Sequence, residues 1–213
     1  ANEPLHNFRI LEPSFGHGDF LIPLIERLLE SYKTFFPDYH KIDENLAKAL
    51  LAVEVNKESI KQARIKLLEI FLSKDISEGD AVKLLDAWIT EGDFLLAELP
   101  HTFTHVVGNP PYVRQELIPD ILMNEYRARY HTIYDRADLY VPFIERCLSN
   151  LEPGGILGFI CSDRWMKNKY GGHLRAMIAK EYCLLSYVDM IGTPAFHSEV
   201  ASYPAITIIK RDN

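Results

Sequence analysis

Short apolar runs alternate with longer amphipathic segments along this chain. The runs at 8–11, 49–55, 104–107 and 156–161 predict buried strands. Apolar residues at helical spacing predict helices over 20–32, 60–71, 77–88, 139–151 and 174–181. A short strand is expected at 89–90, and the stretch 35–45, which contains Pro37, predicts a loop or short insertion. Strand and helix therefore alternate over most of the sequence.

This alternation predicts an α/β fold with a mostly parallel sheet covered by helices on both faces. The last two expected strands, 184–190 and 205–210, have no helix between them. A parallel pair needs a long crossover, so these two strands should be antiparallel neighbours. We therefore expect a Rossmann-like sheet with one antiparallel strand near its end.

Composition places the chain among ordinary globular proteins. It has 213 residues, of which 47% are hydrophobic and 25% charged, which excludes a disordered tail and a collagen-like chain. No apolar run is long enough to cross a membrane, and no secretory signal is visible at the start. The three cysteines lie in apolar stretches without metal-binding spacing, which favours reduced thiols in a cytoplasmic protein.

The charge balance bears on the expected partner. Thirty acidic residues against 23 basic ones give a net charge of −7. A free-standing protein that binds duplex DNA usually has a basic surface. Either nucleic acid is not the partner, or another part of the protein supplies most of the DNA contacts.

Three expected strands end in residues that suit a nucleotide, because ligands of such sheets bind beyond the carboxyl ends of the strands. After the first, Gly16 and Gly18 permit a tight turn and a close backbone approach, although the third glycine of a dinucleotide fingerprint is absent. Glu54 after the second can accept hydrogen bonds from a ribose diol. After the third, Asp93 and Phe94 can bond and cover an adenine. A glycine turn, solvated acids and a core phenylalanine are the alternatives.

The fourth strand ends in the most specific motif, Asn109, Pro110, Pro111 and Tyr112. Two prolines restrict the backbone, so the Asn109 side-chain oxygen and the Pro110 carbonyl can face one point as acceptors. Tyr112 offers a flat face for stacking. This combination suits an exocyclic amino group on a planar base, whereas the alternative is an Asn-Pro turn with a surface tyrosine.

These motifs together resemble the S-adenosylmethionine-dependent N6-adenine DNA methyltransferases of the gamma arrangement. The chain is most similar to the methylase regions of restriction–modification enzymes, including chains that also carry a nuclease. Further points of resemblance are Asp138–Tyr140 followed by Phe143, Pro153–Gly155, and Ser162–Trp165. The resemblance covers nearly the whole chain and implies a seven-stranded methyltransferase fold that transfers a methyl group to the N6 amino group of a flipped adenine in DNA.

The resemblance also implies roles for individual residues. The implied catalytic residues are Asn109, Pro110, Pro111, Tyr112 and Phe196, with the adenine held between the rings of Tyr112 and Phe196. The implied S-adenosylmethionine-binding residues are Glu12, Pro13, Ser14, Phe15, Gly16, Gly18, Phe20, Glu54, Val55, Asp93, Phe94, Asn109 and Phe143. No metal-ligand cluster is visible, and this chemistry requires no metal.

The family's cofactor-covering segment before the first strand and its recognition domain after the last are not found in this sequence. We therefore expect residues 1–213 to form the catalytic domain of a longer enzyme, with DNA and a nuclease domain or subunit as partners. Arg164, Lys167, Lys169 and Arg175 form a basic cluster that suits DNA phosphates, with a solvated loop as the alternative.

Other functions remain open at this point. Similar loops occur in methyltransferases that act on a protein glutamine or an RNA base. A non-catalytic nucleotide-binding subunit is disfavoured by the complete motif at 109–112, and a dehydrogenase by the missing third glycine.

Overall fold

The computed structural model describes residues 3–193 and 204–212. The chain divides into two compact units, Ala1–Ala97 (unit 1) and Glu98–Asn213 (unit 2). Each unit contributes strands and helices to the α/β architecture.

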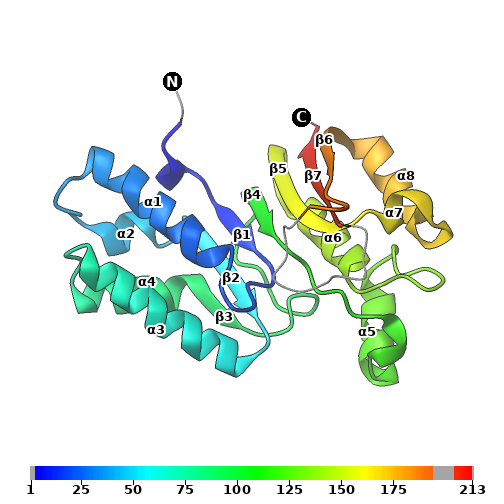
Figure 1. Ribbon diagram of the computed structural model, residues 1–213, viewed down its shortest axis with the longest axis horizontal. Helices are drawn as coiled ribbons and strands as arrows, with labels where there is room; N and C mark the ends of the chain where they lie inside the picture. The colour runs from blue at the N-terminus through cyan, green and yellow to red at the C-terminus, as the bar shows by residue number, and fades with distance from the viewer. Residues whose placement is uncertain (1–2, 194–203, 213) are drawn as a thin grey trace. The chain divides into compact units, whose positions relative to one another are not determined.

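Unit 1 contains three parallel strands. They are β1 (Ile10–Glu12), β2 (Leu50–Glu54) and β3 (Ile89–Glu91), with Ile10 opposite Leu50 and Ala52 opposite Ile89. Its helices are drawn in blue to blue-green in Figure 1 and comprise η1 (Leu5–Asn7), α1 (Leu21–Phe35), α2 (Ile42–Leu46), α3 (Lys57–Ser73) and α4 (Glu78–Trp88). Every residue of β1 and β2 is buried, as expected of parallel strands covered on both faces.

Local sequence explains where these helices begin and how they pack. The Asn56 side chain accepts the Ser59 N–H at the start of α3, and Ser77 accepts the Asp80 N–H at the start of α4. At the end of α4, the fully buried Trp88 donates its indole N–H to the Leu46 carbonyl at 2.8 Å. The interior of unit 1 is thus both apolar and hydrogen-bonded.

Unit 2 contains four strands, β4 (Phe103–Gly108), β5 (Leu151–Ser162), β6 (Tyr182–Asp189) and β7 (Pro204–Arg211). Strand β4 runs parallel to β5, whereas β7 is antiparallel to both β5 and β6. The other elements are η2 (Gln115–Leu117), α5 (Asp120–Arg129), α6 (Tyr140–Ser149), α7 (Arg164–Lys167), η3 (Lys169–Gly171) and α8 (Gly172–Glu181) (Figure 1).

The strand order of the seven-stranded sheet is β3-β2-β1-β4-β5-β7-β6. Because β7 is the antiparallel strand of an otherwise parallel series, the predicted fold class is confirmed. Among the described residues, no helix is long and apolar enough to cross a membrane.

The structure differs from the predicted elements at three places. The stretch 35–45 was predicted as a loop or short insertion, but α2 begins within it at Ile42. Helix α5 was not predicted, because only Met123 and Tyr126 are buried along it and its apolar pattern is weak. Strand β5 begins at Leu151 rather than at 156, since Leu151 pairs with Phe103 before a register irregularity. The turn-like residues at 153–155 concealed this extension.

Candidate cofactor and target-base sites

The glycine loop after β1 has the backbone conformation that its sequence predicts. Gly16 and Gly18 adopt φ of +53° and +90°, a region that other residues rarely enter. The Gly18 N–H donates to the Phe15 carbonyl at 2.8 Å, and the Phe15 N–H donates to Val53 of β2 at 3.3 Å. A Cβ atom on Gly16 would meet no atom within 4 Å, so this side of the loop is open to a ligand.

Glu54, at the end of β2, holds that loop in place. Its Oε2 accepts the Gly16 N–H at 2.8 Å, and its Oε1 accepts the N–H groups of Val55 and Asn56, each at 2.9 Å. Oε1 therefore uses both of its lone-pair sites within the protein, while Oε2 retains one. The sequence suggested a ribose acceptor at Glu54 but gave no sign of its contact with Gly16, which lies 38 positions away.

Glu12 is the second acid of this loop, and its side chain is 1% exposed. Its Oε2 is buried without a hydrogen-bond partner among the described residues. Burial raises the pKa of this carboxyl to about 8, and the nearby charges of Glu54 and Asp19 act in the same direction. Glu12 is therefore mostly protonated at neutral pH, and a cation placed beside it would favour its ionised form.

The remaining candidates of unit 1 differ in accessibility. Val55 is 67% exposed and Phe20 is 39% exposed, so both offer apolar surface to a ligand. Phe94 is 2% exposed, and Asp93 accepts the Leu95 N–H at 2.9 Å. Of the other candidates in the first loop, Pro13 and Phe15 are buried and Ser14 is partly exposed. Their roles in cofactor binding stay predictions.

The Asn-Pro-Pro-Tyr motif follows β4 directly in unit 2. The Oδ1 atom of Asn109 is buried and has no hydrogen-bond partner among the described residues. The Tyr112 ring is 37% exposed, its hydroxyl donates to the Ile160 carbonyl at 3.4 Å, and burial raises the pKa of its phenol. The motif therefore presents an unused acceptor and a partly exposed ring, while Phe196 lies outside the described residues.

Two further tyrosines, Tyr140 and Tyr170, lie next to the loop that carries Tyr112. The Tyr140 ring lies 6.2 Å from the Tyr112 ring at 45°, and the Tyr140 hydroxyl lies 2.8 Å from that of Tyr170. The Leu139 N–H donates to the Val113 carbonyl at 2.9 Å, which joins the start of α6 to the segment after the motif. Phe143, also in α6, is 5% exposed and belongs to the core of unit 2.

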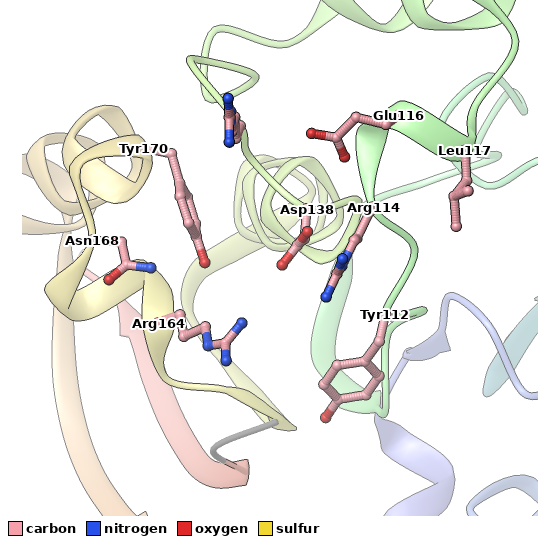
Figure 2. A pocket seen from close by; sticks show the side chains of 9 residues that line it. Tyr112, Arg114, Glu116, Leu117, Asp138, Arg164, Asn168 and Tyr170 are labelled. Carbon is pink, nitrogen blue, oxygen red and sulfur yellow. The ribbon is translucent and has the colours of Figure 1, made fainter. Parts of the chain in front are cut away.

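A cavity of about 600 Å³ opens beside Tyr112 (Figure 2). Its lining residues are Tyr112, Arg114, Glu116, Leu117, Arg136, Asp138, Arg164, Asn168 and Tyr170. In Figure 2 the side chains of Arg114, Asp138 and Arg164 point into the same space. Burial raises the pKa of Asp138, and the charges of Arg164 and Arg114 oppose this rise.

Two residues of the predicted basic cluster, Lys167 and Arg175, bind other groups within unit 2. Lys167 Nζ forms an ion pair with the buried carboxylate of Asp163 at 2.6 Å. Arg175 donates from Nη1 to the carbonyl oxygens of Trp165 at 2.6 Å and Asn168 at 2.9 Å. Arg175 thereby stabilises the turn between α7 and α8, and a role in DNA contact stays a prediction for both residues.

The other two members lie in different surroundings. Arg164 lines the cavity, whereas the Lys169 ammonium lies 6.0 Å above the exposed ring of Tyr134. Arg114 and Arg136 also line the cavity wall, and neither was predicted from the sequence. The position of Arg114 two residues after the motif was the available signal.

The sequence and fold were compared with known proteins. The profile of the Eco57I restriction-modification methylase family matches residues 30–196. The type II methyltransferase M.PaeR7I of Pseudomonas aeruginosa is 53% identical over 211 residues, covering 99% of this chain. The chain spans only 37% of that relative's length.

Two solved structures share the fold at low sequence identity. One is a nuclease-deletion mutant of the type ISP restriction-modification enzyme LlaGI with a DNA substrate mimic, with a TM-score of 0.69 and 18% identity over 96% of this chain and 23% of that chain. The other is the M protein of the type I restriction enzyme EcoKI, with a TM-score of 0.63 and 16% sequence identity. The match covers 99% of this chain and 42% of the M protein. The family profile matches more than half of the sequence, and the chain therefore belongs to the Eco57I restriction-modification methylase family.

Proposed function

We propose that the full-length protein transfers the methyl group of S-adenosylmethionine to the N6 amino group of a flipped adenine in DNA. The family description and the name of the relative at 53% identity, a type II methyltransferase, support methyl transfer within a restriction–modification system. The choice of an amino group as the acceptor is supported by the chemistry of the motif at 109–112.

The observation that carries this proposal is the unpartnered Oδ1 atom of Asn109. Leaving a buried acceptor without a donor costs about 1–3 kcal/mol, so the arrangement favours a ligand that brings a donor. An exocyclic amino group brings two N–H donors. Asn109 Oδ1 accepts one of them in our proposal, and the Pro110 carbonyl accepts the other.

The aromatic part of the site suits a base outside the helix. The amino group of adenine is paired in a duplex, so the nucleotide must leave the stack before it can react. The partly exposed Tyr112 ring provides one stacking face, and we propose Phe196 for the other. Tyr112 stays neutral, since burial raises the pKa of its phenol.

The residues of unit 1 fit S-adenosylmethionine. The open side of Gly16 allows a close backbone approach, and Glu54 Oε2 retains one acceptor site for a ribose hydroxyl. The exposed side chains of Val55 and Phe20 offer apolar surface to an adenine ring. The buried carboxyl of Glu12 suits a ligand with a cationic ammonium group, because such a group stabilises the carboxylate.

The bound cofactor would supply an electrophilic methyl group on its sulfonium. The residues of this chain position the acceptor: Asn109 and Pro110 hold the two amino protons and direct the nitrogen lone pair. Their oxygen atoms also favour the positive charge that develops on N6 as the N–C bond forms and the S–C bond breaks. One N6 proton then passes to solvent. No protein general base is needed, because the methylated nitrogen is strongly acidic.

DNA binding is assigned mainly to the rest of the protein. The net charge of −7 disfavours strong electrostatic attraction of DNA to this chain alone. We propose that residues 1–213 act as the catalytic domain, that a recognition domain outside this sequence selects the site, and that methylation protects it from a partner nuclease.

The test uses the full-length protein with labelled S-adenosylmethionine and separate DNA, RNA and glutamine-peptide substrates, followed by identification of the modified product. N6-methyladenine in DNA is expected. Asn109→Ala should lower turnover by about 100-fold or more while cofactor affinity changes only a few fold. Asn124→Ala, an exposed asparagine on α5, is the matched control. A modified cytosine, RNA or glutamine, or full activity of Asn109→Ala, would refute the proposal.

A further inference from the structure

The residues that line the cavity beside Tyr112 have a net positive charge, whereas the chain as a whole is negative. Three guanidinium groups, from Arg114, Arg136 and Arg164, share its wall with the carboxylates of Glu116 and Asp138. The cavity therefore has an excess of one positive charge in a chain with a net charge of −7. A concave wall concentrates this field on whatever enters, which favours an anionic group.

Two of these arginines are available to a ligand. Within the described residues, neither the Arg114 nor the Arg136 guanidinium makes a hydrogen bond or ion pair, and both side chains are exposed. Burial raises the pKa of Asp138, and the charges of Arg164 and Arg114 in the same cavity act against this rise. Figure 2 shows Arg114, Arg164 and Asp138 directed into the cavity, so a ligand there meets two guanidinium donors beside one carboxylate.

The cavity is directly connected to the target-base loop. Tyr112, the proposed stacking residue, is part of its wall. Arg114 follows two residues later, a separation that spans at most about 7 Å of backbone. The bond from the Leu139 N–H to the Val113 carbonyl fixes this segment to the start of α6, next to Asp138. Arg114 is therefore held close to the Tyr112 ring, on which we propose that the flipped base stacks.

We propose that Arg114, Arg136 and Arg164 bind the phosphodiester group of the target strand next to the flipped adenine. This inference rests on the proposed function and adds the group that positions the extruded nucleotide. Guanidinium groups bind phosphate oxygens through paired N–H donors, and such contacts fix the register of a strand without reading its sequence. A cavity of about 600 Å³ is in the size range of ligand sites and accommodates a nucleotide.

The test pairs protein variants with DNA in which one phosphate is neutral. The full-length protein and its Arg114→Gln and Arg136→Gln variants are titrated with duplexes that carry a single methylphosphonate at successive positions around the target adenine. Arg27→Gln, an exposed arginine on α1, is the matched control. The same samples are incubated with labelled S-adenosylmethionine to identify the methylated base.

We expect one phosphate beside the adenine at which neutralisation lowers wild-type affinity about tenfold. Each cavity variant should bind unmodified DNA more weakly than the wild type, with a salt dependence reduced by about one ion. Neutralising that phosphate should then cost the variant clearly less than it costs the wild type, because one of its three guanidinium partners is already gone. Arg27→Gln should behave like the wild type. Additive losses at every phosphate would overturn the proposal.

The two proposals fail in distinguishable ways. If the wild type makes N6-methyladenine but the losses are additive, the phosphate site is wrong and the proposed function stands. If the non-additive phosphate is found but a different base is methylated, the phosphate site stands and the choice of adenine is wrong.

Discussion

Glu12 should make the stability of this protein fall as pH rises through neutrality. Its carboxyl is 1% exposed and its pKa is raised from 4.5 to about 8. An acid with a raised pKa holds its proton in the native state after the unfolded chain has released it. The native state therefore binds more protons than the unfolded state between pH 4.5 and 8, and stability decreases with pH across this window.

The size of the effect follows from the width of the window. A difference of about 3.5 pKa units corresponds to roughly 5 kcal/mol over the full range. Between pH 5.5 and 7.5 the unfolded chain has released this proton and the native protein mostly keeps it. The free energy of unfolding of the wild type should therefore fall by about 2–3 kcal/mol over this range through Glu12. Glu12→Gln removes the titration. The constant cost of burying an amide cancels when two pH values are compared.

Urea unfolding at several pH values between 5 and 8.5 measures this difference. The free energy of unfolding of Glu12→Gln should rise by about 2–3 kcal/mol relative to the wild type between pH 5.5 and 7.5. Glu69→Gln, an exposed acid on α3, should follow the wild-type curve. Equal pH slopes for Glu12→Gln and the wild type would refute the assignment of a buried, protonated carboxyl.

Two further substitutions test the loop of unit 1 and a turn of unit 2. Glu54→Gln should lower the free energy of unfolding by about 1–3 kcal/mol without any ligand. The reason is that an amide nitrogen cannot accept hydrogen bonds from the N–H groups that the carboxylate binds. An unchanged urea midpoint would contradict this role. Gly171→Ala should be strongly destabilising in thermal melts, because its Cβ would overlap the backbone carbonyl of Trp165. Gly172→Ala has room and is the control, so equal melting temperatures for the two alanine variants would refute the steric argument.

The fold was predictable because its strands are short, apolar and separated by helical patterns. The buried runs of β1 and β2 and the missing helix between β6 and β7 identified a mostly parallel sheet with one reversed strand. The errors arose where burial is sparse or turn residues mislead. Helix α5 buries only Met123 and Tyr126, and Pro153 lies within the strand that it was expected to precede.

Only the residues at the strand ends of the site could be predicted from the sequence. Glu54 and Asn109 were identified because an acid or an amide is unusual at the end of an apolar strand. The contact of Glu54 with Gly16 and the convergence of Arg114 with Arg164 depend on how distant segments pack. No periodic pattern or fixed spacing in the sequence indicates either arrangement, so neither could be predicted from the sequence.

Glu12 and Asn109 share a physical property that supports a common interpretation. Each follows or ends a central strand, and each has a buried oxygen without a partner among the described residues. This property alone does not identify a ligand site, because His6 Nδ1, Trp165 Nε1 and the hydroxyls of Thr132 and Thr207 also lack hydrogen-bond partners among the described residues. Glu12 and Asn109 differ from the other unpartnered groups in lying at the carboxyl ends of two strands, where ligands of such sheets bind. Native proteins leave few such groups unsatisfied, and those at ligand sites acquire their partners on binding. Glu12 suits a cationic partner and Asn109 a neutral N–H donor, the two groups that the proposed cofactor and target base bring.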